Sequence, residues 1–287
     1  MPSHVHLRLD SWECPVATTL ILALIAFLYV RGWLDLRASA PKVVPARRAG
    51  GVLLGLLLIW VAIASPLGSC DSVSLTVHMV QHLLLMTFAP PLIFLGDPFR
   101  VLRHGLPHRL GAVVLAPLFP WSALPRLGSA LAEPVVCWVA ATATLVGWHV
   151  PAFFTLALQS HAWHAVEHAS FLGTGLLFWW PVIQPWPSAS TGPRWSTVLY
   201  LYLATLPCDI LSGFLVFSDR IVYSVYLSTP GSTRLSVLDD QQCAGALMWT
   251  CVTIVYLVAG TILSAHLLTT PSPAPLPPAG PRRLEIA

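Results

Sequence analysis

Seven stretches of mainly apolar residues follow one another along the chain, and none shows the alternation of apolar and polar positions typical of a strand. A helix needs about 20 mainly apolar residues to cross the hydrocarbon core of a bilayer. The pattern therefore predicts an all-α fold, a polytopic membrane helix bundle. Its seven transmembrane helices are expected near residues 15–30, 50–64, 73–95, 134–150, 161–183, 195–217 and 240–267.

Prolines interrupt this pattern at three places. Pro90 and Pro91 are expected to kink or end the third span. Residues 105–133 contain four prolines, which indicates an interfacial or re-entrant connection rather than a span. Residues 270–287 contain six prolines and cannot pack a core. We therefore expect a single transmembrane domain over residues 1–269 and a Pro-rich, disordered cytoplasmic tail over 270–287.

Composition strengthens the membrane prediction and excludes several other classes. The chain is 56% hydrophobic and 9% charged, whereas an average soluble domain is about 25% charged. A net charge of +3 without a basic run gives no reason to expect a nucleic-acid partner. The single lysine, Lys42, lies in a polar loop, which excludes a retinal protein. The six cysteines form no CxxC pair and are interpreted as small buried apolar residues.

The distribution of arginines predicts the topology. The first apolar run follows Asp10 and Glu13 and has no small-residue cleavage site after it, so we expect a retained span rather than a signal peptide. Of the 15 basic residues, 12 fall in alternate loops and the tail, and Arg8, Arg220 and Arg234 lie on the other side. The positive-inside rule then places the N-terminus outside and the C-terminus in the cytoplasm of a multi-pass plasma-membrane protein.

Histidines and methionines gather where predicted spans meet the outer face. Ionisable residues within spans are costly and usually face a site. Pairs of histidines four residues apart share a helix face in the third span and again in the fifth. Imidazole and carboxylate suggest a transition metal, and thioethers favour Cu(I). The candidate metal ligands are His78, Met79, His82, Met86, His149, His164, His168, Asp240 and Met248.

The same residues also have ordinary interpretations. The histidines can bond neighbouring carbonyls, the methionines can pack, and Asp240 can cap a helix. Glu167 is interpreted as a partner of a ligand or as an exposed residue. The sequence does not decide whether other nearby groups take part, namely His161, Cys243 and the His4/His6 pair.

Four motifs resemble the CtaG-type cytochrome c oxidase assembly factors. They are HMVQHLLLM at 78–86 with APP at 89–91 and GDP at 96–98, WHVP at 148–151, HAVEH at 164–168 leading to FWWPV at 178–182, and DQQ at 240–242 leading to MW at 248–249. The resemblance implies a membrane assembly factor that is not an enzyme. It also implies copper insertion into the catalytic subunit of a haem-copper oxidase, with an extracytoplasmic protein as a further candidate partner that donates the copper.

Three other functions use the same residues. A haem-binding, cytochrome b-like electron carrier would use His82 and His168 as axial ligands. A membrane copper importer would need polar groups through the inner half, where Asp209 is the main one. A metalloprotease would need HExxH, which is absent, and His164 to His168 matches only the inverse order HxxEH.

Overall fold

The computed structural model describes residues 15–40, 43–69, 72–106, 133–183, 194–228 and 235–269, and these ranges contain helices and no strand. The all-α prediction is therefore confirmed for the described part of the chain. His4 and His6, residues 107–132 of the predicted connection and the predicted tail lie outside it. The α-helices are α1 (Val16–Ser39), α2 (Ala46–Ala64), α3 (Leu75–Leu83), α4 (Ala89–Leu95), α5 (Pro98–Gly105), α8 (Pro134–Trp148), α9 (Pro151–Gln159), α10 (His161–Ile183), α11 (Arg194–Phe217) and α12 (Val237–Thr269).

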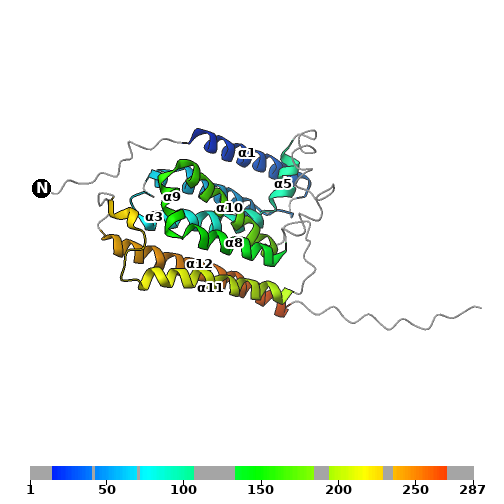
Figure 1. The fold of residues 1–287 in the computed structure, drawn as a ribbon. Coiled ribbons are helices and arrows are strands. Elements are labelled where there is room, and N and C mark those ends of the chain that lie inside the picture. The colour runs from blue at the N-terminus through cyan, green and yellow to red at the C-terminus, as the bar shows by residue number, and fades with distance from the viewer. Residues whose placement is uncertain are drawn as a thin grey trace, which may run out of the picture.

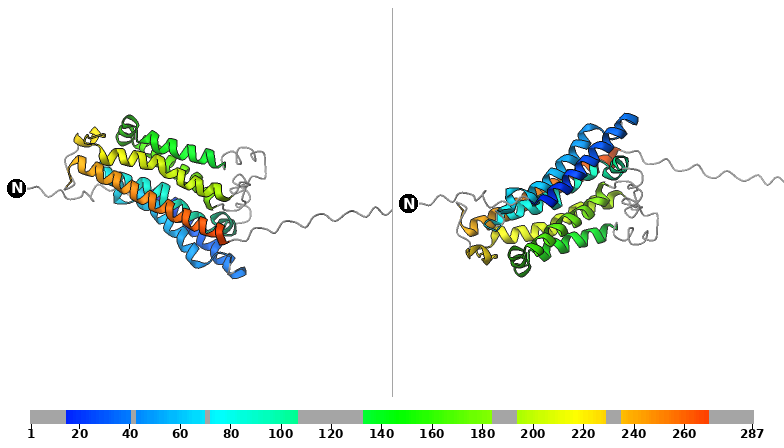
Figure 2. Two further views of the ribbon diagram at one scale, coloured as in Figure 1. Left: turned by 90° about the horizontal axis from the view of Figure 1, so that it is seen from below. Right: turned by 90° about the horizontal axis from the view of Figure 1, so that it is seen from above.

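The long helices form a layered bundle (Figure 1). Helices α11 and α12 lie side by side along one face, as the two further views also show (Figure 2). Helix α1 with α5 covers the opposite face, and α3, α8 and α10 lie between these two layers (Figure 1). The short elements are the 3₁₀ helices η2 (Pro66–Ser69) and η5 (Ser224–Ser228) and the π-helical turn η3 (Leu84–Phe88).

Within the described ranges, five helical segments are long and apolar enough to cross a membrane: Val16–Ser39, Ala46–Gly68, Leu75–Leu95, Trp195–Phe217 and Val237–Thr269. The pair α8 and α9 counts as a sixth if it forms one broken span. Helix α10 has 23 residues but carries three histidines and a glutamate in its first eight, which makes that end polar. The number seven and the orientation of the termini remain predictions.

The fourth predicted span does not run straight to residue 150. Helix α8 ends at Trp148, and α9 leaves it at 76° from Pro151 onward. Val150 is extended, with φ −66° and ψ 125°, because the ring of a following proline disfavours helical backbone at the preceding residue. The sequence prediction missed this bend although Pro151 signals it.

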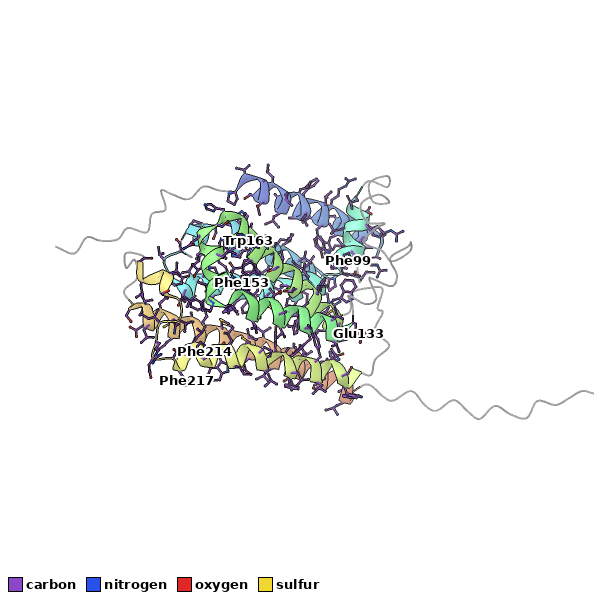
Figure 3. The ribbon with its side chains drawn as sticks, in the orientation of Figure 1. Phe99, Glu133, Phe153, Trp163, Phe214 and Phe217 are labelled. Carbon is purple, nitrogen blue, oxygen red and sulfur yellow. The ribbon has the colours of Figure 1, made fainter. Side chains whose placement is uncertain are left out.

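Apolar and polar side chains are distributed as in a membrane protein. Large apolar side chains such as Phe153, Phe214 and Phe217 are exposed on the outer faces (Figure 3). By contrast, His78 and Glu167 are fully buried. A bundle in lipid gains nothing from hiding apolar side chains, and it places costly polar groups in its interior.

The third predicted span contains one π-helical turn directly before its two prolines. The N–H of Ala89 bonds the carbonyl of Leu84, five residues back. Pro90 has no N–H to give to the carbonyl of Met86, four residues back. The indole Nε1–H of Trp179 on α10 donates to this carbonyl instead, at 3.2 Å. The helix therefore continues through η3 into α4 and does not end at the prolines, which was one of the two outcomes that the sequence predicted.

A glycine lets α10 approach this turn closely. A Cβ atom added to Gly175 would lie 2.8 Å from Cα of Met86 and 2.9 Å from its carbonyl oxygen. Backbone atoms at that distance cannot move aside without shifting a helix. At Gly173, two residues earlier on α10, an added Cβ atom would lie in open space.

We expect Gly175→Ala to destabilise the detergent-purified protein by about 1–3 kcal/mol, the usual cost of overpacking. Thermal unfolding followed by tryptophan fluorescence would measure the change. The matched control is Gly173→Ala, which should leave the midpoint equal or higher because alanine favours helix over glycine. Equal midpoints for the two variants would contradict the close packing of α10 on η3.

Candidate functional site

All five histidines predicted as metal ligands meet at the end of the bundle where α9 lies. His78 and His82 come from α3, and their ring centroids are 4.4 Å apart. His164 and His168 come from α10, with centroids 4.1 Å apart. Between the two helices, His78 and His164 are separated by 5.6 Å and His82 and His168 by 5.9 Å. His149, at the break between α8 and α9, lies 6.2 Å from His82.

Glu167 lies inside this histidine cluster, not at its edge or on the surface. Its Oε1 atom is 3.4 Å from Nε2 of His78 and 3.4 Å from Nε2 of His82. Glu167 is fully buried. It follows His164 by three residues on α10, so it shares the face of that histidine. This spacing is the sequence signal that could have placed Glu167 in the site.

The distances among these three residues fit a metal ion. One donor atom from each of His78, His82 and Glu167 lies within 4.8 Å of the other two. In a tetrahedral site with bonds of 2.0–2.1 Å, neighbouring donor atoms are about 3.3 Å apart. The two separations of 3.4 Å between Glu167 and the histidines match this value.

Several polar atoms of the cluster are buried without a hydrogen bond from any described residue. They include Nδ1 of His82, Nε2 of His168 and Oε2 of Glu167. Leaving such an atom unpaired costs about 1–3 kcal/mol. A bound cation would offset part of this cost because imidazole nitrogens and carboxylate oxygens are metal ligands.

Aromatic rings hold the two histidines of α3 in place. The ring of Phe171 stacks on His82 at 4.0 Å, and Phe154 meets His78 edge-on at 4.9 Å. Phe154 belongs to α9, so the 76° bend after α8 is what brings it over the cluster. Phe154 also contacts Tyr223, with ring centroids 4.2 Å apart.

One hydrogen bond to a backbone carbonyl fixes the tautomer of His149. Its Nδ1 atom is 2.7 Å from the carbonyl oxygen of Leu145. A carbonyl only accepts, so Nδ1 carries the proton. In the neutral ring Nε2 then has a free lone pair, and this atom lies 3.3 Å from the sulfur of Met79. A ring nitrogen that donates to a backbone carbonyl while the other stays open is the usual arrangement of a metal-binding histidine.

Tyr223, between α11 and α12, supports the break that carries His149. Its hydroxyl donates to the backbone carbonyl of His149 at 3.0 Å. Burial raises the pKa of Tyr223, with Glu167 as a second contributor. The hydroxyl therefore stays protonated and keeps this bond at any ordinary pH.

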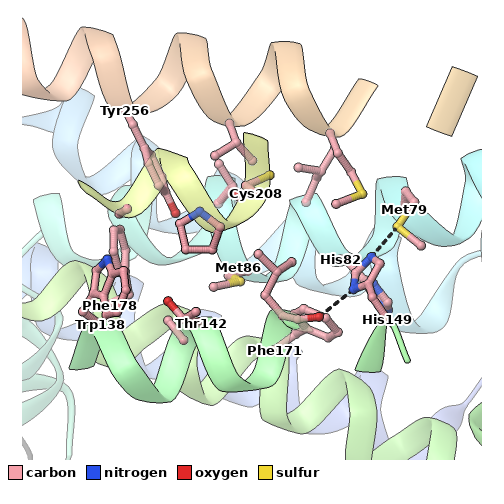
Figure 4. A pocket seen from close by; sticks show the side chains of 18 residues that line it. Met79, His82, Met86, Trp138, Thr142, His149, Phe171, Phe178, Cys208 and Tyr256 are labelled. Carbon is pink, nitrogen blue, oxygen red and sulfur yellow. Dashed lines mark hydrogen bonds between the residues drawn. The ribbon is translucent and has the colours of Figure 1, made fainter. Parts of the chain in front are cut away.

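A cavity of about 40 Å³ begins beside His149 and continues between α8, α11 and α12 (Figure 4). Three of the chain's four methionines line it, together with one cysteine: Met79, Met86, Met248 and Cys208. His82 and His149 also line it. The predicted ligands Met86 and Met248 thus lie on this cavity. Cys208 was not among the predicted ligands, because nothing in its spacing along the chain distinguishes it from a packing residue.

The carboxylate of Asp240 accepts hydrogen bonds from residues at the start of α3. Its Oδ2 accepts from the backbone N–H of Leu75 at 2.7 Å, and its Oδ1 accepts from the hydroxyl of Ser74 at 3.0 Å. The carboxylate therefore joins α12 to the N-terminus of α3, one turn before His78. Among the residues that the sequence left undecided, His161 and Cys243 are exposed.

We expect Asp240→Asn to lower the stability of the protein by about 1–3 kcal/mol, because it weakens buried charge-assisted bonds to α3. Thermal unfolding in detergent would measure this loss. The neighbouring variant Asp239→Asn is the control, since Asp239 contacts only Ser236 of its own helix start among the hydrogen bonds described. A larger loss for Asp239→Asn would contradict the role assigned to Asp240.

Comparison with known proteins gives one family and a few distant relatives. The family model described as cytochrome c oxidase caa3 assembly factor matches residues 27–270. An uncharacterized protein of Mycobacterium leprae is 24% identical over 243 residues, which are 83% of this chain and 36% of that protein. One of Mycobacterium tuberculosis is 26% identical over 236 residues, 78% of this chain and 34% of that protein.

The chain spans about a third of the length of these curated relatives. No solved structure matches it. The residues of this chain that the family model matches begin within α1, extend through α12 and include every residue of the histidine cluster.

Proposed function

The chain belongs to the cytochrome c oxidase caa3 assembly factor family, and from this premise we propose that it binds copper and passes it to the oxidase catalytic subunit. Copper is cargo here, not a resident cofactor, and the protein is a binding and transfer protein rather than an enzyme. The observation that carries the proposal is the buried group of His78, His82 and Glu167, with donor atoms at metal-ligand spacing.

The chemistry of the cluster suits a transferable ion. Neutral imidazoles bind copper in either common oxidation state, and thioethers add preference for Cu(I). The three protein donors of the cluster leave a position open for an incoming ligand, as sites that exchange or activate a ligand do. An oxidase histidine could enter this position and draw copper across a helix interface by stepwise ligand exchange.

The location of the site is part of the proposal. The cluster lies at the end of the bundle that the arginine distribution assigns to the outer face of the plasma membrane. Copper would then arrive from an extracytoplasmic donor and leave toward the membrane-embedded catalytic subunit. His149, His164 and His168 lie around the same group and are further candidate ligands.

The cavity gives little support to the haem alternative. Pockets that hold drug-sized or larger cofactors measure about 300–1,000 Å³, whereas this cavity measures about 40 Å³. An ion or a water-sized group fits such a space, and a porphyrin does not. An importer would need a polar path through the other half of the bundle, where Asp209 bonds Thr253 at 3.3 Å outside the cavity lining.

An anaerobic Cu(I) titration of purified protein against a competing chelator tests the proposal. Wild type should bind Cu(I) near stoichiometrically and show no Soret band. The double variant His78→Gln/His82→Gln should bind at least about 100-fold more weakly, since it removes two of the imidazole ligands. The control His104→Gln should bind as wild type, because His104 is exposed on α5 and pairs with Asp35.

The same variants should differ in how well they support oxidase maturation in cells that depend on this protein. We expect the double variant to leave the oxidase short of copper and His104→Gln to restore it. A folded wild-type protein that binds no copper would overturn the proposal. It would leave a scaffold that assists oxidase assembly without touching the metal.

A further inference from the structure

We propose that the copper site is divided into two subsites of different chemical softness that share His82. The first, called here the nitrogen–oxygen subsite, consists of His78, His82 and Glu167. The second, the sulfur subsite, begins where Met79 meets His149 and continues into the methionine-lined cavity. This inference deepens the proposed function and rests on it.

The geometry of Met79 and His149 carries the sulfur subsite. Nδ1 of His149 donates to Leu145, so the lone pair of Nε2 faces the thioether sulfur of Met79 at 3.3 Å. Two electron-pair donors in contact gain nothing from each other. With metal bonds of about 2.0 Å to nitrogen and 2.3 Å to sulfur, this separation gives an angle of about 100° at a shared ion.

Sulfur atoms from three further positions line the same cavity. Met86 lies in η3, Cys208 on α11 and Met248 on α12. Cys208 and Met248 are buried. Thioether and thiolate ligands select Cu(I), whereas imidazole and carboxylate ligands bind divalent ions as well as they bind Cu(I). The two groups of side chains therefore differ in the metal that each prefers.

His82 connects the subsites. Its Nε2 lies 3.4 Å from Glu167, its ring centroid lies 6.2 Å from that of His149, and it lines the cavity. An ion held by His82 can lose its bond to Glu167 or His78 as a bond to Met79 or His149 forms. Copper remains Cu(I) throughout this exchange, and neither an electron nor a proton has to move.

Two probe ions with different preferences test the division. Ag(I) is a soft, redox-inert substitute for Cu(I), and Co(II) prefers nitrogen and oxygen ligands and reports binding by its visible absorption. Purified full-length protein would be titrated with each ion separately. Met79→Leu should weaken Ag(I) binding at least tenfold and leave Co(II) binding within twofold of wild type.

The reverse pattern is expected for the nitrogen–oxygen subsite. Glu167→Gln should weaken Co(II) at least tenfold and leave Ag(I) within twofold, and His82→Gln should weaken both ions. Glu133→Gln is the matched control for Glu167, because Glu133 directly precedes α8 at the opposite end of the bundle (Figure 3). Cys208→Ser should weaken Ag(I), whereas Cys251→Ser on α12, outside the cavity lining, should not.

The outcomes separate this inference from the function on which it rests. If Met79→Leu and Glu167→Gln each weaken both ions to the same extent, the site is undivided and the inference is wrong, while copper binding stands. If folded wild type binds neither ion, the proposed function itself fails. Should Met79→Leu not fold, Met248→Leu gives the same comparison. X-ray absorption of the Cu(I) form adds an independent reading, a copper–sulfur distance of about 2.3 Å.

Discussion

The contact of one carboxylate with two imidazoles joins the parts of this bundle that matter for its chemistry. Glu167 of α10 lies between His78 and His82 of α3, fully buried. The hydrocarbon core of a bilayer offers these groups no water, so their partners have to come from the bundle or from a bound ion. The positions of α3 and α10 are therefore tied to each other by this contact, and the other helices pack around the pair.

Two further polar residues secure the same end. Asp240 bonds the start of α3, and the next residue, Gln241, accepts from the backbone N–H of Val222 at 2.8 Å. Helix α12 is thereby bonded to α3 and to the segment after α11. At the opposite end, α1 and α5 approach through Gly32 and Gly105, where an added Cβ would strike backbone. Directed bonds thus join α12 to α3 and to the segment after α11, whereas close backbone packing joins α1 to α5.

The sequence predicted those features that depend only on residues close to one another in the chain. Apolar runs predict helices, and histidines four residues apart must share a face, so the pairs in α3 and α10 followed from periodicity alone. The bend after Trp148 could also have been predicted from Pro151. The spacing from His164 indicates the face of α10 on which Glu167 lies, but its contacts could not be predicted, because its partners are on another helix 85 to 89 residues away in the chain. The same holds for the hydrogen bond that the distant indole of Trp179 donates to the carbonyl of Met86.

The cavity shows the same limit of sequence reasoning. Met79, Met86 and Met248 were selected for their chemistry, and the structure gathers them around one space with Cys208. Spacing along a helix places Met79 and Met86 near one face, but it cannot say that α11 and α12 bring two more sulfur atoms to that face. The preference of a site for soft metal ions depends on ligands from several helices, and only the packing of these helices shows which ligands come together.

Helix α10 connects the histidine cluster with the π-helical turn of the third span. Glu167 near its start contacts the histidines, and Trp179, twelve residues or about 18 Å further along, bonds the carbonyl of Met86. A helix does not stretch between these points. A shift of α10 along its axis would therefore move both Glu167 and the indole that bonds the methionine turn.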